Sequence, residues 1–156
     1  MTVEFEVTTR IAAPRDVVFD LSLDVAAHSA SLADSKERAV GGVTTGEIGL
    51  GEDVTWPAIH FGIRFRMTSR VTDLDRPSRF VDRQVRGPFR RFDHEHVFVP
   101  DNGGTLMVDR VSFDAPAGVI GRVVERLVLG PYLERLIETR GGFLKREAEK
   151  RHQAES

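Results

Sequence analysis

The sequence contains no cysteine, so a disulfide framework, a thiolate metal site and a cysteine nucleophile are excluded. It also lacks any apolar run approaching the roughly 18 residues that a transmembrane helix needs. The N-terminal segment carries Glu4 and Glu6 and shows no basic stretch followed by an apolar one. These absences predict a cytoplasmic protein without membrane insertion.

An excess of charge of either sign is also missing, since 22 Lys and Arg face 24 Asp and Glu. Nucleic acid and anionic surfaces are therefore not expected as partners. The 156 residues, 40% apolar and 29% charged, are close to the globular average and fit one hydrophobic core. We expect a single domain over residues 1–156, without repeats or linkers.

Seven segments have the pattern of antiparallel strands. In residues 2–12, Val3, Phe5 and Val7 alternate with Glu4 and Glu6. Glycine, proline and asparagine turns then recur at intervals typical of strands. The remaining predicted strands are 37–45, 53–61, 63–75, 79–86, 90–100 and 104–113.

Three segments are predicted as helices. Pro14 favours the start of a short helix, and a second covers residues 24–32. From Gly118 to about Arg151, apolar residues recur at three- and four-residue spacing, which predicts a long helix with a kink or break at Gly130–Pro131. The polar tail after Lys145 is expected to fray in its last residues.

This order of elements predicts an α+β fold. A seven-stranded, curved antiparallel sheet needs an apolar cover on its concave face, and the long C-terminal helix is the segment that can supply it. The outward face of residues 63–75 carries Arg64, Arg66 and Arg70, which we interpret as a solvated row. The side chains predicted to line a cavity between sheet and helix are Trp56, His60, Phe65, Met67, Asp82, Phe92, His94, His96, Phe98, Met107 and Asp109, with Val124, Leu127 and Val128 from the helix.

Polar residues gather on this inward face. A two-residue turn at Asn102–Gly103 sets His96 opposite Asp109 and Phe98 opposite Met107. A turn around Gly87–Pro88 places Asp82 near His94. The predicted inward polar cluster is His60, Asp82, Gln84, His94, His96 and Asp109.

Several roles are open for this cluster. A buried carboxylate needs a partner, so imidazole and carboxylate can form a structural pair that fixes strand register. The same pair can contact a ligand's hydroxyl or carbonyl, or act as general acid and base. His-x-His with a carboxylate can also bind zinc or iron, but no third strong ligand is evident, so we predict no metal and no cofactor.

The glycine-rich segment Gly46–Gly51 lacks the lysine of a phosphate-binding loop and opens no helix. We interpret it as a flexible loop at the mouth of the cavity.

Motifs along most of the chain support a family resemblance. They include Ile11-Ala12-Ala13-Pro14, Asp53-Val54-Thr55-Trp56, Pro77-Ser78-Arg79-Phe80, Gly87-Pro88-Phe89, His94-Glu95-His96 and Gly104-Thr105. With these motifs the sequence resembles the SRPBCC superfamily, which includes START domains, the birch-pollen-allergen fold and polyketide cyclases. The resemblance implies a helix-grip fold with a cavity between sheet and helix.

Two functions are compatible with that resemblance, because the superfamily mixes carriers, receptors and enzymes. The first is binding or transport of a small hydrophobic ligand, such as a lipid, an aromatic metabolite or a polyketide. The second is a cyclase or aromatase in which His94 or His96 moves protons. A third hypothesis is a partner-binding module that uses the sheet edge or the helix near Gly130–Pro131, and the chain is expected to be a monomer or a homodimer.

Overall fold

The computed structural model describes residues 2–32, 39–60, 63–114 and 128–155. The chain begins with strand β1 (Val3–Ile11), followed by the short helices α1 (Arg15–Leu23) and α2 (Val25–Ser31). Six strands and a long helix follow: β2 (Gly41–Gly42), β3 (Asp53–His60), β4 (Ile63–Asp75), β5 (Arg79–Arg86), β6 (Arg91–Asp101), β7 (Gly104–Asp114) and α4 (Gly130–Glu155). This order confirms the predicted α+β architecture.

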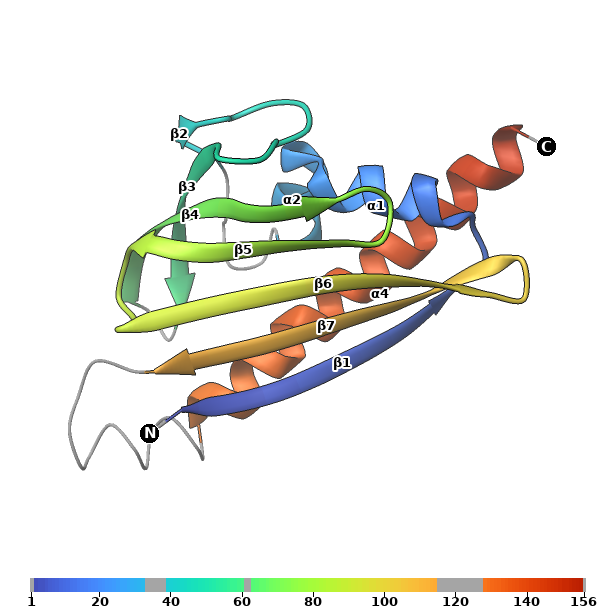
Figure 1. Ribbon diagram of the computed structural model, residues 1–156. Coiled ribbons are helices and arrows are strands. Elements are labelled where there is room, and N and C mark those ends of the chain that lie inside the picture. Colours follow the sequence, from blue (N-terminus) through green and yellow to red (C-terminus); the bar gives the residue numbers. More distant parts are fainter. Residues whose placement is uncertain (1, 33–38, 61–62, 115–127, 156) are drawn as a thin grey trace.

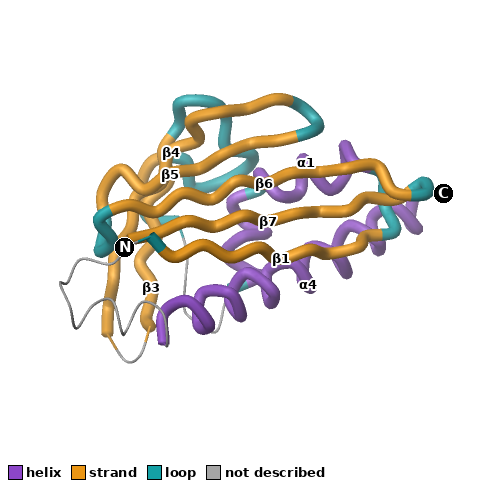
Figure 2. The backbone as a smooth tube through the Cα atoms, turned by 60° about the horizontal axis from the view of Figure 1, so that its bottom comes forward, coloured by secondary structure: helices purple, strands orange, loops and turns teal. Residues whose placement is uncertain are grey.

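The strands form one antiparallel sheet in the order β1-β7-β6-β5-β4-β3-β2 (Figure 1). Helix α4 runs along one face of this sheet and contacts β1, α1 and α2 (Figure 2). The sheet curves around the helix, so the predicted helix-grip fold is confirmed. In the part of the chain that the structure describes, none of the helices has the length and apolar character needed to cross a membrane.

Local sequence signals explain the short helices. Pro14 precedes α1 with extended backbone, and Asp16 lies in the first turn, where the helix dipole favours a negative charge. The side chain of Asp24 accepts a hydrogen bond from the amide of Ala27 at 2.9 Å, which caps the start of α2. The two helices are therefore separated at Asp24.

The long helix differs in its bounds from the prediction. Helix α4 begins at Gly130, where the sequence predicted an interruption, and Pro131 lies in its first turn, where proline is tolerated. Residues 118–127 of the predicted helix lie outside the described residues. The polar sequence after Lys145 predicts fraying, but α4 continues to Glu155, with Lys145 bonded to Glu149 at 2.6 Å.

The predicted strand 37–45 is largely wrong, since only Gly41–Gly42 pairs with β3 among its described residues. Gly42 has a φ of +67°, and a Cβ atom there would lie 2.1 Å from the carbonyl oxygen of Asp53. This left-handed backbone ends the strand and admits glycine alone. The other strands agree with the prediction within about two residues.

Two apolar clusters form the core. The larger includes Phe19, Phe98, Met107 and Leu144, and the smaller is built from Val7, Val111, Phe113 and Ile137. Along β7, the inward positions run from Met107 in the first cluster through position 109 to Val111 in the second. Asp109 is therefore inserted between two apolar regions.

Candidate functional site

A layer of charged and polar side chains separates the two apolar clusters. It consists of Asp82 on β5, His94 and His96 on β6, Asp109 on β7 and Arg140 on α4, and we call it the polar layer. All members except Asp82 are buried. Strand alternation places the β6 and β7 members inward, because His94 and His96 lie between Phe92 and Phe98 on one face of β6, and Asp109 lies between Met107 and Val111 on one face of β7.

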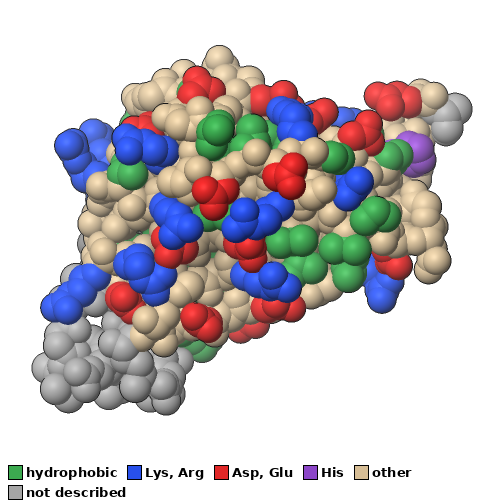
Figure 3. Space-filling view, in the orientation of Figure 1, with side chains coloured by type: hydrophobic (Ala, Val, Ile, Leu, Met, Phe, Trp, Pro, Cys, Tyr) green, Lys and Arg blue, Asp and Glu red, His purple; other side chains and the backbone are tan. Residues whose placement is uncertain are grey.

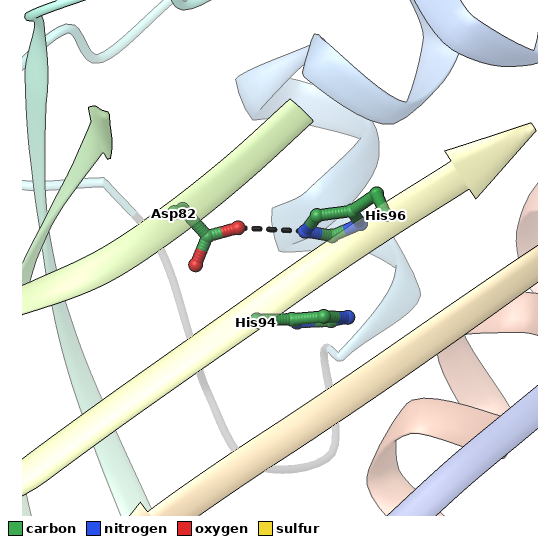
Figure 4. Close-up of side chains that lie close together, drawn as sticks. All are labelled: Asp82, His94 and His96. Atoms are coloured by element: carbon green, nitrogen blue, oxygen red, sulfur yellow. Dashed lines mark hydrogen bonds and ion pairs between the residues drawn. The ribbon is translucent and has the colours of Figure 1, made fainter. Parts of the chain in front are cut away.

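Each histidine donates a hydrogen bond to a carboxylate. His94 Nε2 lies 2.8 Å from Asp109 Oδ1, and His96 Nε2 lies 2.6 Å from Asp82 Oδ2 (Figure 4). An ionised carboxylate only accepts, so each Nε2 carries the hydrogen. The two imidazole rings stack with centroids 3.8 Å apart.

The predicted strand register is confirmed. His96 is opposite Asp109, Phe98 is opposite Met107, and Asp82 is opposite His94. The hydrogen bonds, however, connect diagonal neighbours: His96 bonds to Asp82 rather than to Asp109, and His94 bonds to Asp109 rather than to Asp82. His96 Nδ1 still approaches Asp109 Oδ1 to 3.3 Å, without the geometry of a hydrogen bond.

Arg140 joins the layer from the helix side. Its Nη1 lies 3.5 Å from Asp109 Oδ1, and its Nη2 donates to the carbonyl of Ser22 in α1 at 3.3 Å. The guanidinium thus connects α4, α1 and the sheet at one buried point. Arg140 was not among the predicted site residues, although position 140 lies three residues after Ile137 and four before Leu144, on the apolar stripe of the helix.

The surroundings move the pKa values of the carboxylates downward. Burial alone would raise the pKa of Asp109, but its contacts with His94 and His96 and the charge of Arg140 outweigh this and hold that pKa far below its usual range. Burial also opposes ionisation of Asp82, and the hydrogen bond from His96 reverses the effect, so the pKa of Asp82 is lowered. Both carboxylates are therefore ionised at neutral pH.

The histidines are shifted in opposite directions. Burial lowers the pKa of His94, and the neighbouring charge of His96 lowers it further. Burial also acts to lower the pKa of His96, but its contacts with Asp109 and Asp82 dominate and raise it. The layer thus holds two carboxylates and one guanidinium, and its surroundings favour the charged form of His96 and the neutral form of His94.

A metal ion fits this arrangement poorly. Asp82, His94 and His96 each offer a ligand atom within 4.8 Å of the others, so the structure supplies the third ligand that the sequence did not reveal. The imidazole rings, however, are stacked with only 21° between their planes. Their in-plane lone pairs run nearly parallel and cannot converge on one ion at about 2.1 Å. Each Nε2 is also bonded to a carboxylate, so the geometry favours a hydrogen-bonded pair.

Aromatic and apolar side chains surround the polar layer. Phe80 stacks on the ring of His96 at 4.0 Å, and buried Trp56 packs on His28 at 4.2 Å. Phe98 and Met107 are buried in the larger apolar cluster. In contrast, Phe65, Met67 and Phe92 are only half-buried.

Several predicted lining residues are not brought to the site. Val128 is 45% exposed before the start of α4, so it does not contribute to a buried lining. Gln84 does not join the polar cluster, because its amide exchanges hydrogen bonds of 2.7 and 3.2 Å with the backbone of Phe89 and closes the β5–β6 turn. Val124, Leu127 and the side chain of His60 lie outside the described residues.

The loop 46–51 is anchored against the helices rather than loose. The amide of Val25 donates to the carbonyl of Gly46 at 2.9 Å, and that of Ile48 donates to Leu23 at 3.1 Å. The side chain of Ile48 is buried in the larger apolar cluster.

The outward face of the sheet has a different character. Arg64, Arg66 and Arg70 are exposed, as predicted, and Arg70 pairs with Asp53 at 2.7 Å. Figure 3 shows basic and acidic side chains interspersed over this face. It is therefore a solvated surface rather than part of the inward site.

A surface depression of about 440 Å³ lies between the β6–β7 turn and α4. Its lining includes Arg10, Asp101, Lys145 and His152. Arg10 is paired with Asp101, and Lys145 with Glu149. The hollow is open and these four polar side chains lie in its wall, so it does not enclose an apolar ligand, and the polar layer is the better candidate site.

Solved structures of known proteins share this fold. The Zhui aromatase/cyclase from Streptomyces sp. R1128 is 24% identical with a TM-score of 0.75, and the alignment covers 97% of this chain and 96% of that one. TTHA0849 from Thermus thermophilus is 20% identical with a TM-score of 0.72, covering 91% and 97% of the two chains. The major latex-like protein 151 from Panax ginseng is 12% identical with a TM-score of 0.65, covering 94% and 97%.

A search of curated protein sequences gave no significant match. A family model described as polyketide cyclase / dehydrase and lipid transport matches residues 2–149. This description covers both predicted functions, the binding of small hydrophobic molecules and cyclase chemistry, and the match agrees with the resemblance to the SRPBCC superfamily. The chain therefore belongs to the polyketide cyclase / dehydrase and lipid transport family.

Proposed function

We propose that the protein binds a small hydrophobic molecule between the concave face of the sheet and α4, and that the polar layer fixes the molecule's polar group. The observation that carries this proposal is the contrast along the concave face. Phe98 and Met107 are fully packed, whereas Phe65, Met67 and Phe92 keep part of their apolar surface accessible. Apolar walls with a few convergent polar groups are typical of small-molecule sites.

The hydrogen bonding of the polar layer supports the same proposal. Within the described part of the chain, His96 Nδ1, Asp109 Oδ2 and Arg140 Nη1 are buried and have no hydrogen-bond partner. His96 Nδ1 and Arg140 Nη1 lie within ion-pair distance of Asp109, yet none of the three atoms has a hydrogen bond, and buried polar atoms nearly always have one, so this lack needs a reason. In a layer built only to hold strand register, every donor and acceptor would have a hydrogen bond, whereas a binding site keeps some donors and acceptors for its ligand.

The proposal is tested with N-phenyl-1-naphthylamine, a neutral dye that fluoresces in apolar surroundings. Saturable binding of one dye per chain is expected. Met67→Gln should weaken it roughly ten- to a hundredfold, because an apolar contact worth about 1.5–3 kcal/mol is lost. Arg66→Gln is the matched control, since the adjacent side chain is exposed on the outward face. Equal affinities of both variants, or no saturable binding, would contradict the proposal.

A second candidate function is cyclase chemistry. It is favoured by the stacked pair of His94, whose pKa is lowered, and His96, whose pKa is raised, because such a pair sets a candidate base beside a candidate acid. With a linear poly-β-keto thioester, the protein should then accelerate ring closure over the spontaneous reaction. His94→Gln should abolish the acceleration while dye binding persists. Identical product formation with and without protein would exclude this function.

The remaining expectations are also part of the proposal. The family match over residues 2–149 supports a single domain, and we propose a cytoplasmic location. Sizing chromatography with light scattering separates a 17.4 kDa monomer from a homodimer.

A further inference from the structure

Asp82 is the accessible member of the polar layer. Its side chain is 26% exposed, whereas those of His94, His96, Asp109 and Arg140 are at most 7% exposed. Only Oδ2 is occupied by His96, and the other carboxylate oxygen points away from that ring (Figure 4). A molecule that reaches the layer therefore meets a carboxylate oxygen first, and this oxygen can only accept a hydrogen bond.

The charges of the layer leave no place for an anionic group. His96 already lies between Asp82 and Asp109, at 2.6 and 3.3 Å. Arg140 already faces Asp109 and the carbonyl of Ser22. A ligand carboxylate would bring a second negative group beside Asp82 without a cation of its own, and an uncompensated buried charge is strongly unfavourable.

A cationic group is also disfavoured, because it would bring a further charge into a buried layer whose two carboxylates already face Arg140 and the two histidines. The polar group that suits this position is neutral and carries a hydrogen to donate. Hydroxyl, phenol and enol groups meet both conditions, whereas an ionised fatty acid meets neither.

We infer that the ligand of this site is a neutral apolar molecule whose hydroxyl or enol group donates a hydrogen bond to Asp82, and that apolar carboxylates are excluded. This inference rests on the proposed function and names the chemical class that it selects.

Three ligands with the same ring system test the inference: 2-naphthol, 2-methylnaphthalene and 2-naphthoate, each titrated against the bound dye at pH 7. Methyl replaces hydroxyl at nearly equal size, and naphthoate carries the charge. A hydrogen bond to a charged acceptor predicts that 2-naphthol binds roughly ten- to a hundredfold more tightly than 2-methylnaphthalene. The unpaired charge predicts that 2-naphthoate binds at least about tenfold more weakly than 2-methylnaphthalene.

Asp82→Asn supplies the reciprocal test. Removing this negative charge should leave the affinity of 2-methylnaphthalene unchanged. The affinity of 2-naphthol should then exceed it only a few-fold, and the affinity of 2-naphthoate should fall less far below it than in the unmodified protein. Asp93→Asn is the matched control. Asp93 precedes His94 on β6, its side chain lies on the outward face of the sheet, and it is paired with Arg91 at 2.5 Å. All three affinities should stay as in the unmodified protein.

The outcomes separate this inference from the proposed function. Tightest binding of 2-naphthoate, or an unchanged advantage of 2-naphthol in Asp82→Asn, would overturn the inference alone. Equal binding of 2-naphthol and 2-methylnaphthalene to the unmodified protein would do the same. If neither the dye nor any of the three ligands binds, the proposed function fails and the inference with it.

Discussion

Replacing Arg140 by methionine should destabilise the protein strongly, because it removes a cation from the buried polar layer. Methionine keeps the length and much of the apolar volume of the side chain, so the loss of packing is small. Asp109, which is fully buried, would lose the guanidinium at 3.5 Å. Removing one partner of a buried ion pair costs about 3–5 kcal/mol. Since His94 and His96 still contact Asp109, we expect the lower end, about 3 kcal/mol.

Urea unfolding followed by the fluorescence of the single tryptophan measures this loss. Trp56 is buried against His28, so it reports the loss of the packed sheet and helices. With a slope of about 1–3 kcal/mol per molar urea, the midpoint should fall by roughly 1–3 M. Arg135→Met on the exposed side of the same helix is the control and should stay within about 0.5 kcal/mol.

A double-mutant cycle with Asp109→Asn decides whether the two residues act together. The double variant removes both charges, so its cost should be lower than the sum of the single costs by about 0.5–3 kcal/mol. Additive costs, or a loss below about 1 kcal/mol for Arg140→Met, would refute the idea that Arg140 compensates a buried carboxylate.

The same contacts determine how pH, metal ions and two helix glycines affect stability. The pKa of His96 is raised, so its stabilising contribution is present below the unfolded pKa of about 6.5 and is lost as the pH rises through its folded pKa. The pKa of His94 is lowered, so its stabilising contribution is present above about 6.5 and is lost as the pH falls through its folded pKa. The free energy of unfolding should thus peak near pH 6.5, and a His94→Gln/His96→Gln variant that still shows the peak would contradict this assignment. Adding zinc or a chelator should leave the Tm unchanged, since the stacked rings do not converge; a rise of several degrees with zinc would show a metal centre. Gly141→Ala should be destabilising, because the added Cβ would lie 2.7 Å from Thr9 Oγ1 on β1. Gly142→Ala should stabilise the protein by about 1 kcal/mol, because its Cβ would meet only the flexible end of Arg146, at 3.4 Å. Equal effects of the two variants in thermal unfolding would disprove the close approach of α4 to β1.

Much of the sheet could be predicted because strand alternation and turn chemistry are local properties. Asn102 and Gly103 both have positive φ angles, of 49° and 84°, as a tight two-residue hairpin turn requires. This turn fixed the register that brings His96 opposite Asp109. The strand at Gly41–Gly42 was mispredicted because its length depends on the close approach of Gly42 to Asp53 across the sheet, which is not a local signal.

The composition of the polar layer was only partly predictable. Alternation alone placed Asp82, His94, His96 and Asp109 on the inward face. The choice of hydrogen-bond partners depends on how the imidazole rings stack, and strand parity does not determine that rotation. Arg140 comes from an element far along the chain, so its pairing with Asp109 required the docking of α4 onto the sheet. An arginine on an apolar helical stripe was nevertheless a usable signal.

The central claim, that the concave face holds a small neutral apolar molecule, is tested most directly by native mass spectrometry of the protein purified from its own host. The bound compound is then extracted into organic solvent and identified. We expect one apolar compound per chain, carrying a hydroxyl or enol group and no carboxylate. Stoichiometric recovery of a fatty acid would contradict the proposed selectivity for neutral ligands over carboxylates. A protein that is empty as purified and also fails to bind the dye would contradict the binding function itself.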